Sequence, residues 1–202
     1  GDKEMEKEHI DRLFSVFESR LAGADAVILS DYDQGVFSSG MIRRSVSACR
    51  RAGIPVVADS RFRIENFQGV TTATPNEVEA ARAVGVRLGG EKELQATGSR
   101  LLRRLRSDSI LVTRGRFGMS LFARGRRRVD AQVVGSPEAT DVTGAGDTVV
   151  AAVALSLAAG LDMKVAMALA NMAASIVVMK RGTAVAGPDE LAGVIERECQ
   201  AV

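Results

Sequence analysis

The sequence predicts an α/β fold in which a mainly parallel sheet is covered by helices on both faces. Short apolar runs, typical of strands buried on both sides, alternate along the chain with longer segments of helical periodicity. This alternation favours parallel pairing, because parallel neighbours need a long crossover between them, usually a helix. We find no repeat, linker or low-complexity tract, and we therefore expect residues 1–202 to form one domain.

The first half of the chain contains helices and strands in alternation. Apolar spacing predicts helices over residues 3–22 and 39–52, and strands over 26–29, 56–58 and 70–73. The turn-prone segments 31–35 and 74–79 come directly after the first and third of these strands.

The second half resumes the alternation and then becomes helical. The expected elements are a helix over 91–106, a strand over 109–113, hairpin strands over 119–123 and 127–134, helices over 145–159 and 162–179, and a last helix that begins at Pro188. Arg124, Arg126, Arg127 and Arg128 cluster around the hairpin turn, where we expect solvated side chains. In such sheets ligands bind beyond the carboxyl ends of the strands. The candidate functional loops are therefore 31–35, 74–79 and 141–147.

Composition excludes several classes of function. Lys and Arg number 27 against 25 Asp and Glu, so the net charge of +2 gives no general case for binding nucleic acid or a membrane. Cys49 and Cys199 are the only cysteines, and they form neither a disulfide framework nor a thiolate metal site. No apolar run approaches the roughly 18 residues of a membrane span, and we expect a cytoplasmic protein. A homodimer is left open, because these residues do not decide the oligomeric state.

The loop 141–147 carries the chemistry that the sequence shows most clearly. Gly144, Ala145 and Gly146 precede an alanine-rich helix, where small side chains let backbone N–H groups and the helix dipole converge on an anion. Asp147 follows in the first helical turn, within reach of a hydroxyl that attacks a phosphate held there. On spacing alone, an ordinary turn with an acid that complements the helix dipole is an equally good interpretation.

The whole run from Asp141 to Thr148, Asp-Val-Thr-Gly-Ala-Gly-Asp-Thr, resembles the nucleotide-site signature of the ribokinase-like (PfkB-type) carbohydrate kinases. The resemblance implies a ribokinase-like fold, ATP as the phosphoryl donor, Mg²⁺, and a monovalent cation for which K⁺ is a candidate. It implies that Asp147 is the catalytic base and that Gly144, Ala145 and Gly146 form the anion hole. Asp141 and Thr143 would border the monovalent-cation site.

Further segments match the family in the same order along the chain. Asn76 and Glu79 resemble its Asn-x-x-Glu motif, which helps to place phosphate and magnesium, the latter through water. Taken alone, these residues are a helix cap and a first-turn acid. The resemblance places the remaining nucleotide-site residues in a strand-to-loop segment, in the helix near adenine and in the closing loop: Thr113, Gly115, Gly118, Asn171 and Gly182. Most of the helix around Asn171 is expected to be core.

Within the family, the chain most resembles the kinase half of the bacterial heptose-phosphate kinase and adenylyltransferases. Two pairs depart from that pattern: Asp33-Gln34 stands where Gly-Lys is usual, and Ser60-Arg61 stands where Pro-Lys is usual. The first change removes a lysine that would suit an anionic sugar and adds a carboxylate, and Arg61 compensates only in part. The family's upstream glycine-rich sugar motif and its lid strands have no counterpart here, so the match covers the carboxyl-terminal, nucleotide-binding part of such a kinase.

The expected function is ATP-dependent phosphoryl transfer to a hydroxyl of a sugar or sugar phosphate, with heptose 7-phosphate as one candidate. Two alternatives remain at this stage. One is a catalytically silent nucleotide-binding module, and the other is a kinase that acts on a non-sugar alcohol such as a nucleoside or a vitamin.

Overall fold

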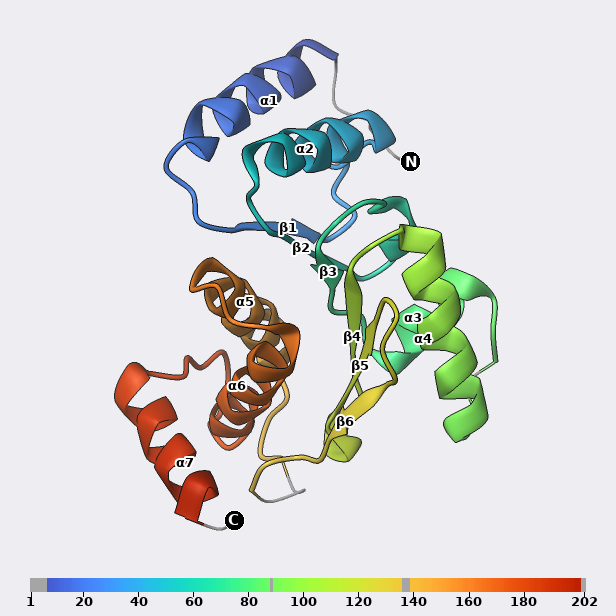
Figure 1. Cartoon of the computed structure of the whole chain (residues 1–202). Helices are drawn as coiled ribbons and strands as arrows, with labels where there is room; N and C mark the ends of the chain where they lie inside the picture. The colour runs from blue at the N-terminus through green and yellow to red at the C-terminus, as the bar shows by residue number, and fades with distance from the viewer. Residues whose placement is uncertain (1–6, 88, 136–138, 201–202) are drawn as a thin grey trace.

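A six-stranded sheet lies between two layers of helices in the computed structural model, which describes residues 7–87, 89–135 and 139–200 (Figure 1). The strands follow one another across the sheet in chain order: β1 Val27–Asp31, β2 Val56–Ser60, β3 Thr72–Ala73, β4 Ser109–Thr113, β5 Met119–Ala123 and β6 Val129–Ala131. β1 to β4 pair in parallel, and β4, β5 and β6 pair antiparallel. The mainly parallel α/β sheet expected from the sequence is confirmed.

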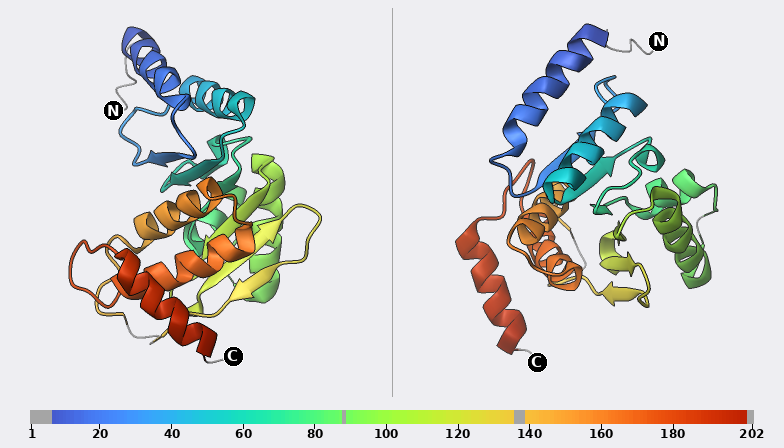
Figure 2. Two further views of the ribbon diagram at one scale, coloured as in Figure 1. Left: turned by 60° about the vertical axis from the view of Figure 1, so that its left-hand side comes forward. Right: turned by 45° about the horizontal axis from the view of Figure 1, so that its top comes forward.

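Helices cover both faces of this sheet (Figures 1 and 2). One layer contains α1 Lys7–Leu21, α2 Ser39–Ala52, α3 Glu77–Val84 and α4 Glu91–Leu105, together with the short 3₁₀ turn η1 Ile64–Asn66. On the opposite face lie α5 Ala145–Ala158 and α6 Met163–Val177, and α7 Pro188–Gln200 packs on α6. Residues 3–6 of the first predicted helix lie outside the described residues.

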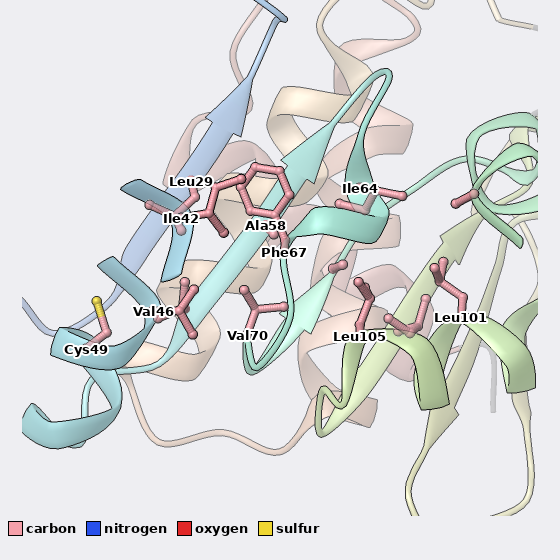
Figure 3. Close-up of a cluster of buried hydrophobic side chains, with 14 of the residues drawn as sticks. Leu29, Ile42, Val46, Cys49, Ala58, Ile64, Phe67, Val70, Leu101 and Leu105 are labelled. Carbon is pink, nitrogen blue, oxygen red and sulfur yellow. The ribbon is translucent and has the colours of Figure 1, made fainter. Parts of the chain in front are cut away.

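The buried strands send alternate side chains into two separate apolar clusters. In β4, Ile110 and Val112 belong to the cluster under α1 to α4, whereas Leu111 belongs to the cluster under α5 and α6. β2 repeats the pattern, with Val57 on the α5 side. Figure 3 shows part of the first cluster, in which Phe67 is fully buried. This period-two alternation explains why the strands read as continuous apolar runs in the sequence.

Local capping fixes where several helices begin and end. The Ser38 hydroxyl accepts a hydrogen bond from the Met41 N–H at the start of α2, and Gly53 ends that helix in the left-handed conformation. Asp162 caps α6 in the same way as Ser38 caps α2. These side chains satisfy the N–H groups that a helix leaves unpaired in its first turn.

Three features of the fold differ from the sequence-based expectation. The second hairpin strand covers residues 129–131 only: Ala131 pairs with Met119, the first residue of β5, and the Gln132 carbonyl accepts a hydrogen bond from the Asn171 side chain of α6 instead. The eight-residue helix α3 was predicted only through its cap, Asn76, and not in its extent, and the third strand is two residues long. The arginine turn is not wholly solvated, because Arg124 donates to the Ser107 carbonyl and the Arg128 side chain, 17% exposed, forms ion pairs.

Candidate functional site

The carboxyl ends of the parallel strands and the amino terminus of α5 meet at one edge of the sheet. β1 ends at Asp31, which is followed by Tyr32, and the phenol of Tyr32 donates a 2.8 Å hydrogen bond to Oδ1 of Asp147. The Thr113 N–H at the end of β4 donates to the Pro75 carbonyl at 3.0 Å. The charges of Glu79, Asp147 and Asp31 all act on Asp59, so the three loops chosen from the sequence are neighbours in space, as the topology of a parallel sheet requires.

Asp147 lies in the first turn of α5, which begins with a left-handed glycine. Gly144 has φ +80°, and its carbonyl accepts from both the N–H and the hydroxyl of Thr148 at 3.0 Å. Because the first-turn N–H groups of a helix have no intrahelical acceptor, this end of α5 can bind an anion. A Cβ at Gly146 would meet no atom within 4 Å, so the helix end faces open space.

A cavity of about 390 Å³ adjoins this helix end. Ala145 and Gly146 form one side of it, and the turn from Thr113 to Gly118 forms the other. Its volume is within the roughly 300–1,000 Å³ of small-molecule sites. Six predicted nucleotide-binding residues line it: Thr113, Gly115, Gly118, Ala145, Gly146 and Asn171. Arg116 is the charged side chain in this lining, and it lies 4.9 Å from the Phe117 ring centroid.

Gly118 lies where the backbone has no room for a side chain. Its φ is +78°, and an added Cβ would come within 2.0 Å of the Ala131 carbonyl oxygen. The space that the missing side chain leaves is thus filled by the backbone of β6. Gly115, which also has a positive φ of +54°, has no such close neighbour.

Asn76 and Glu79 form a reciprocal capping box at the start of α3. The Glu79 N–H donates to Asn76 Oδ1 at 2.9 Å, and the Asn76 N–H donates to Glu79 Oε2 at 2.9 Å. Asn76 is therefore a helix cap and Glu79 a first-turn acid, as their positions alone indicated. The capping box also fixes both side chains at the edge of the site, with the Glu79 charge close enough to affect Asp59.

Asp59 is a carboxylate to which the sequence analysis gave no role. It is partly buried next to the end of β2, and burial, followed by the charges of Glu79, Asp147 and Asp31, raises its pKa from 3.8 to about 6. Asp31 itself is buried and accepts from the Ser60 hydroxyl at 3.0 Å. Among the described residues, no group of three or more His, Cys, Asp or Glu side chains is arranged to hold a metal ion by itself.

Asp141 joins two loops at the far side of the helix end. Its Oδ1 accepts from the Thr143 N–H and its Oδ2 from the Gly182 N–H, each at 2.9 Å. These hydrogen bonds, that from Thr143 first, hold the pKa of Asp141 below its usual value. The predicted proximity of Asp141, Thr143 and Gly182 is present in the structure.

Asn171 lies on α6, 5% exposed, where its side-chain amide donates to the Gln132 carbonyl. The same side chain lines the cavity, opposite the turn that contains Gly115. Asn171 therefore connects the helix layer to the end of β6 as well as bordering the candidate ligand site. The alanine and methionine residues around it are largely core, as expected.

The sequence pattern of the pfkB carbohydrate kinases matches residues 3–190. The chain belongs to the pfkB family. Curated relatives include the bifunctional protein HldE of Aeromonas salmonicida, 42% identical over 189 residues, and that of Desulfatibacillum aliphaticivorans, 37% identical over 192 residues. These alignments cover 92% and 94% of this chain but only 38% and 39% of the relatives. The chain thus spans about two fifths of the length of these pfkB proteins.

Solved pfkB-type kinases share the fold. Ribokinase of Arabidopsis thaliana, complexed with ribose and ATP, has a TM-score of 0.77 at 20% identity, over 95% of this chain and 60% of that one. Phosphofructokinase-2 of Escherichia coli, in complex with potassium, has a TM-score of 0.79 at 18% identity, over 96% of this chain and 63% of that one. Within the described residues, no helix combines the length and the apolar character that crossing a membrane requires.

Three site residues had no role in the sequence-based prediction: Tyr32, Asp59 and Arg116. Tyr32 lies in the candidate loop 31–35 but received no role of its own, and Asp59 directly follows the predicted strand 56–58, a position that could have selected it. The role of Arg116 was hidden, because a cation in a strand-to-loop turn is ordinarily solvated.

Proposed function

We propose that this chain binds ATP in the cavity beside α5 and supports transfer of its γ-phosphoryl group to a hydroxyl of a sugar or sugar phosphate. The observation that carries the proposal is the position of Asp147. It directly follows two residues that line the cavity, at a helix end suited to an anion. A base is thus placed beside the site where a transferring phosphate would be held.

The roles proposed for the residues follow from this arrangement. Asp147 accepts the proton of the acceptor hydroxyl as the hydroxyl oxygen bonds to the γ-phosphorus, and the bond from that phosphorus to the β–γ bridging oxygen breaks to release ADP. Tyr32 occupies Oδ1 of Asp147 with its hydrogen bond, which leaves Oδ2 to accept the proton. The N–H groups near Gly144, Ala145 and Gly146 stabilise the phosphoryl charge. Thr113, Gly115, Gly118, Asn171 and Gly182 border the nucleotide.

The acidic edge of the site suits a divalent cation. Burial, followed by the charges of three nearby carboxylates, raises the pKa of Asp59, so positive charge nearby would be favourable. Mg²⁺ keeps several waters and is commonly held by one or two carboxylates and substrate phosphates, so it needs no preformed cage. Glu79, through water, and Asp59 would hold it beside Asn76, and it would neutralise phosphate charge.

A monovalent cation, K⁺ in this proposal, would lie near Asp141 and Thr143. The carboxylate of Asp141 stays ionised under ordinary conditions, because its pKa is lowered by backbone N–H donors. Carboxylate and hydroxyl oxygens are suitable ligands for such a hard cation.

Heptose 7-phosphate is the acceptor to test first, because the sequence resembles heptose-phosphate kinases and the relatives are HldE proteins. The test measures turnover and ATP affinity of the full-length protein with Asp147→Asn, using that acceptor, other sugar phosphates, free sugars and a nucleoside. We expect at least about a hundredfold loss of turnover with unchanged ATP affinity, the lower range for a general base. Near-normal turnover in the variant would remove Asp147 from the chemistry.

A second candidate function is a nucleotide-binding unit that has no turnover alone. The partial coverage of the relatives favours this candidate, because this chain spans only 38% of the Aeromonas salmonicida HldE protein. ATP binding by the 202-residue chain without transfer to any acceptor would support it.

A further inference from the structure

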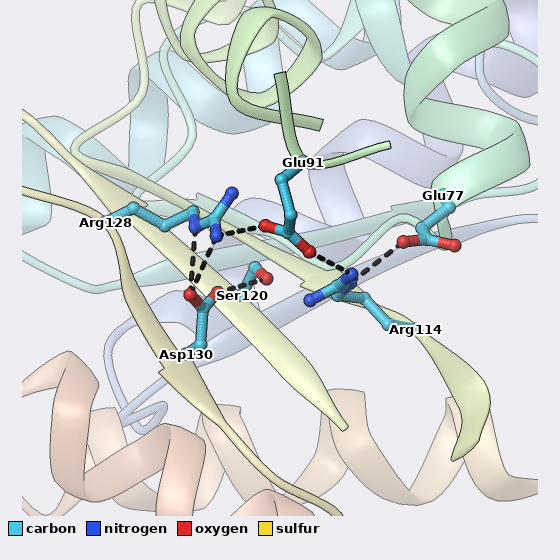
Figure 4. Close-up of polar contacts among 6 residues, drawn as sticks. All are labelled: Glu77, Glu91, Arg114, Ser120, Arg128 and Asp130. Carbon is cyan, nitrogen blue, oxygen red and sulfur yellow. Dashed lines mark hydrogen bonds and ion pairs between the residues drawn. The ribbon is translucent and has the colours of Figure 1, made fainter. Parts of the chain in front are cut away.

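A chain of ion pairs joins side chains of Glu77, Arg114, Glu91, Arg128 and Asp130 (Figure 4). Arg114 Nε is 2.8 Å from Glu77 Oε1, and Arg114 Nη2 is 2.9 Å from Glu91 Oε1. The other oxygen of Glu91 pairs with Arg128, which also pairs with Asp130 at 2.9 Å. The chain connects the first turns of α3 and α4 to β6, three segments that are separate in the sequence.

The backbone of Arg114 begins the turn that forms one side of the cavity. Its N–H donates to the Gly118 carbonyl at 2.8 Å, and its carbonyl accepts from the Phe117 N–H at 3.0 Å. Gly115, Arg116 and Gly118, which lie within this turn, line the cavity. The orientation of Arg114 therefore affects the position of the whole cavity wall.

The side chain of Arg114 ties this wall to the Asn76–Glu79 segment. Glu77 directly follows Asn76, whose backbone forms a parallel bridge with Thr113. The Arg114 side chain is 14% exposed and that of Glu77 is 32% exposed, so this pair is less screened by water than surface pairs are, whereas Glu91 is 61% exposed. A guanidinium can hold two carboxylates along fixed directions, which a single ammonium cannot do.

We propose that Arg114 is a positioning residue for nucleotide binding: by holding Glu77 and Glu91 at once, it fixes the turn 113–118 against the Asn76–Glu79 segment. The two sides of the site then keep one separation before the nucleotide enters. Arg114 acts through the backbone of the turn and needs no contact with the nucleotide. The proposal rests on the nucleotide-binding function proposed above.

The test uses calorimetric titration of the chain with a non-hydrolysable ATP analogue in Mg²⁺ and K⁺, for Arg114→Met, Arg114→Lys and Glu77→Gln. Arg103→Met, which changes an exposed arginine of α4, is the matched control. We expect about tenfold weaker binding for Arg114→Met, only partial recovery for Arg114→Lys, and no change for the control.

The Glu77→Gln variant distinguishes an effect of the position of Arg114 on nucleotide binding from an effect of charge alone. Removing a negative charge near the site strengthens binding of an anionic nucleotide if charge alone matters, whereas loss of the Arg114 partner weakens it if position matters. We expect about threefold weaker binding. In the double variant with Arg114→Met, binding should be no weaker than for Arg114→Met alone, because both changes remove the same contact. Tighter binding for Glu77→Gln, or full recovery with Arg114→Lys, would overturn the proposal.

Amide hydrogen exchange without nucleotide tests the same claim independently of ligand binding. Arg114→Met should accelerate exchange of the Arg114, Phe117 and Gly118 amides at least about tenfold, while the β2 amides keep their rates. Unchanged exchange in the turn would refute positioning by Arg114. A wild-type chain that binds no nucleotide would instead overturn the proposed function, and with it the role of Arg114 in binding. Equal affinity of wild type and Arg114→Met would overturn only the present inference.

Discussion

Asp59→Asn should stabilise the protein while weakening its binding of a magnesium nucleotide. The pKa of Asp59 is raised from 3.8 to about 6, so its ionised form is less favourable in the folded protein than in the unfolded chain. One pKa unit corresponds to about 1.4 kcal/mol, which gives about 3 kcal/mol as an upper figure. Because Asp59 is partly exposed, screening by water reduces the expected gain in unfolding free energy to about 1–2 kcal/mol at pH 7.5.

The pH dependence gives this prediction its sign. Below pH 3.8 Asp59 is protonated in both states and has no effect, and its cost grows as the pH rises through the interval up to about 6. Urea unfolding should therefore show the full gain for Asp59→Asn at pH 7.5 and about half of it at pH 5. Asp25→Asn, an exposed acid outside this cluster, is the control and should change stability by less than about 0.5 kcal/mol. Destabilisation by Asp59→Asn, or a gain that does not increase with pH, would refute the electrostatic account of this cluster.

Three other substitutions test separate parts of the site. Gly118→Ala should lower the unfolding free energy by about 3 kcal/mol in thermal or urea denaturation, because its Cβ would meet the Ala131 carbonyl. The control Gly125→Ala should lower it by only about 1–2 kcal/mol, because Gly125 has φ +67° but no close neighbour. Equal losses at both glycines would contradict the close approach of β6. Arg116→Gln should weaken binding of the ATP analogue about tenfold and reduce the salt dependence of that binding in calorimetry. Arg126→Gln, which lies outside the cavity lining, should change neither; equal effects of the two variants would show that Arg116 does not contact the nucleotide. Tyr32→Phe should lower turnover about fivefold without changing nucleotide affinity, because Asp147 loses an orienting donor that is 56% exposed; unchanged turnover would show that the hydrogen bond is incidental.

The sequence was sufficient to predict how strands and helices alternate along the chain and where the loop 141–147 lies. Buried strands such as β4 are apolar on both faces, so their alternation with helices identified the sheet. The run from Asp141 to Asp147 is contiguous, so no tertiary information was needed to find it. The spatial meeting of Thr113 and Pro75 followed from parallel topology.

Features that depend on side chains from distant segments could not be predicted in this way. Arg128 was expected to be solvated and Arg114 received no role, and only the packing of α4 places Glu91 between them. The close approach of β6, which leaves no room for a side chain at Gly118, depends on the pairing of β6 with β5. The raised pKa of Asp59 arises from burial and three other carboxylates, a combination that no local pattern encodes.

The most direct test of the central claim is calorimetric titration of this chain with a non-hydrolysable ATP analogue in Mg²⁺ and K⁺, for the wild type and for Gly144→Val. Valine at φ +80° strains the backbone and places a branched side chain at the helix end that is proposed to hold phosphate. The account predicts binding by the wild type and at least about tenfold weaker binding by the variant, with both proteins folded by circular dichroism. Equal affinity of the two folded proteins, or no binding by the wild type, would contradict a nucleotide site at the amino terminus of α5.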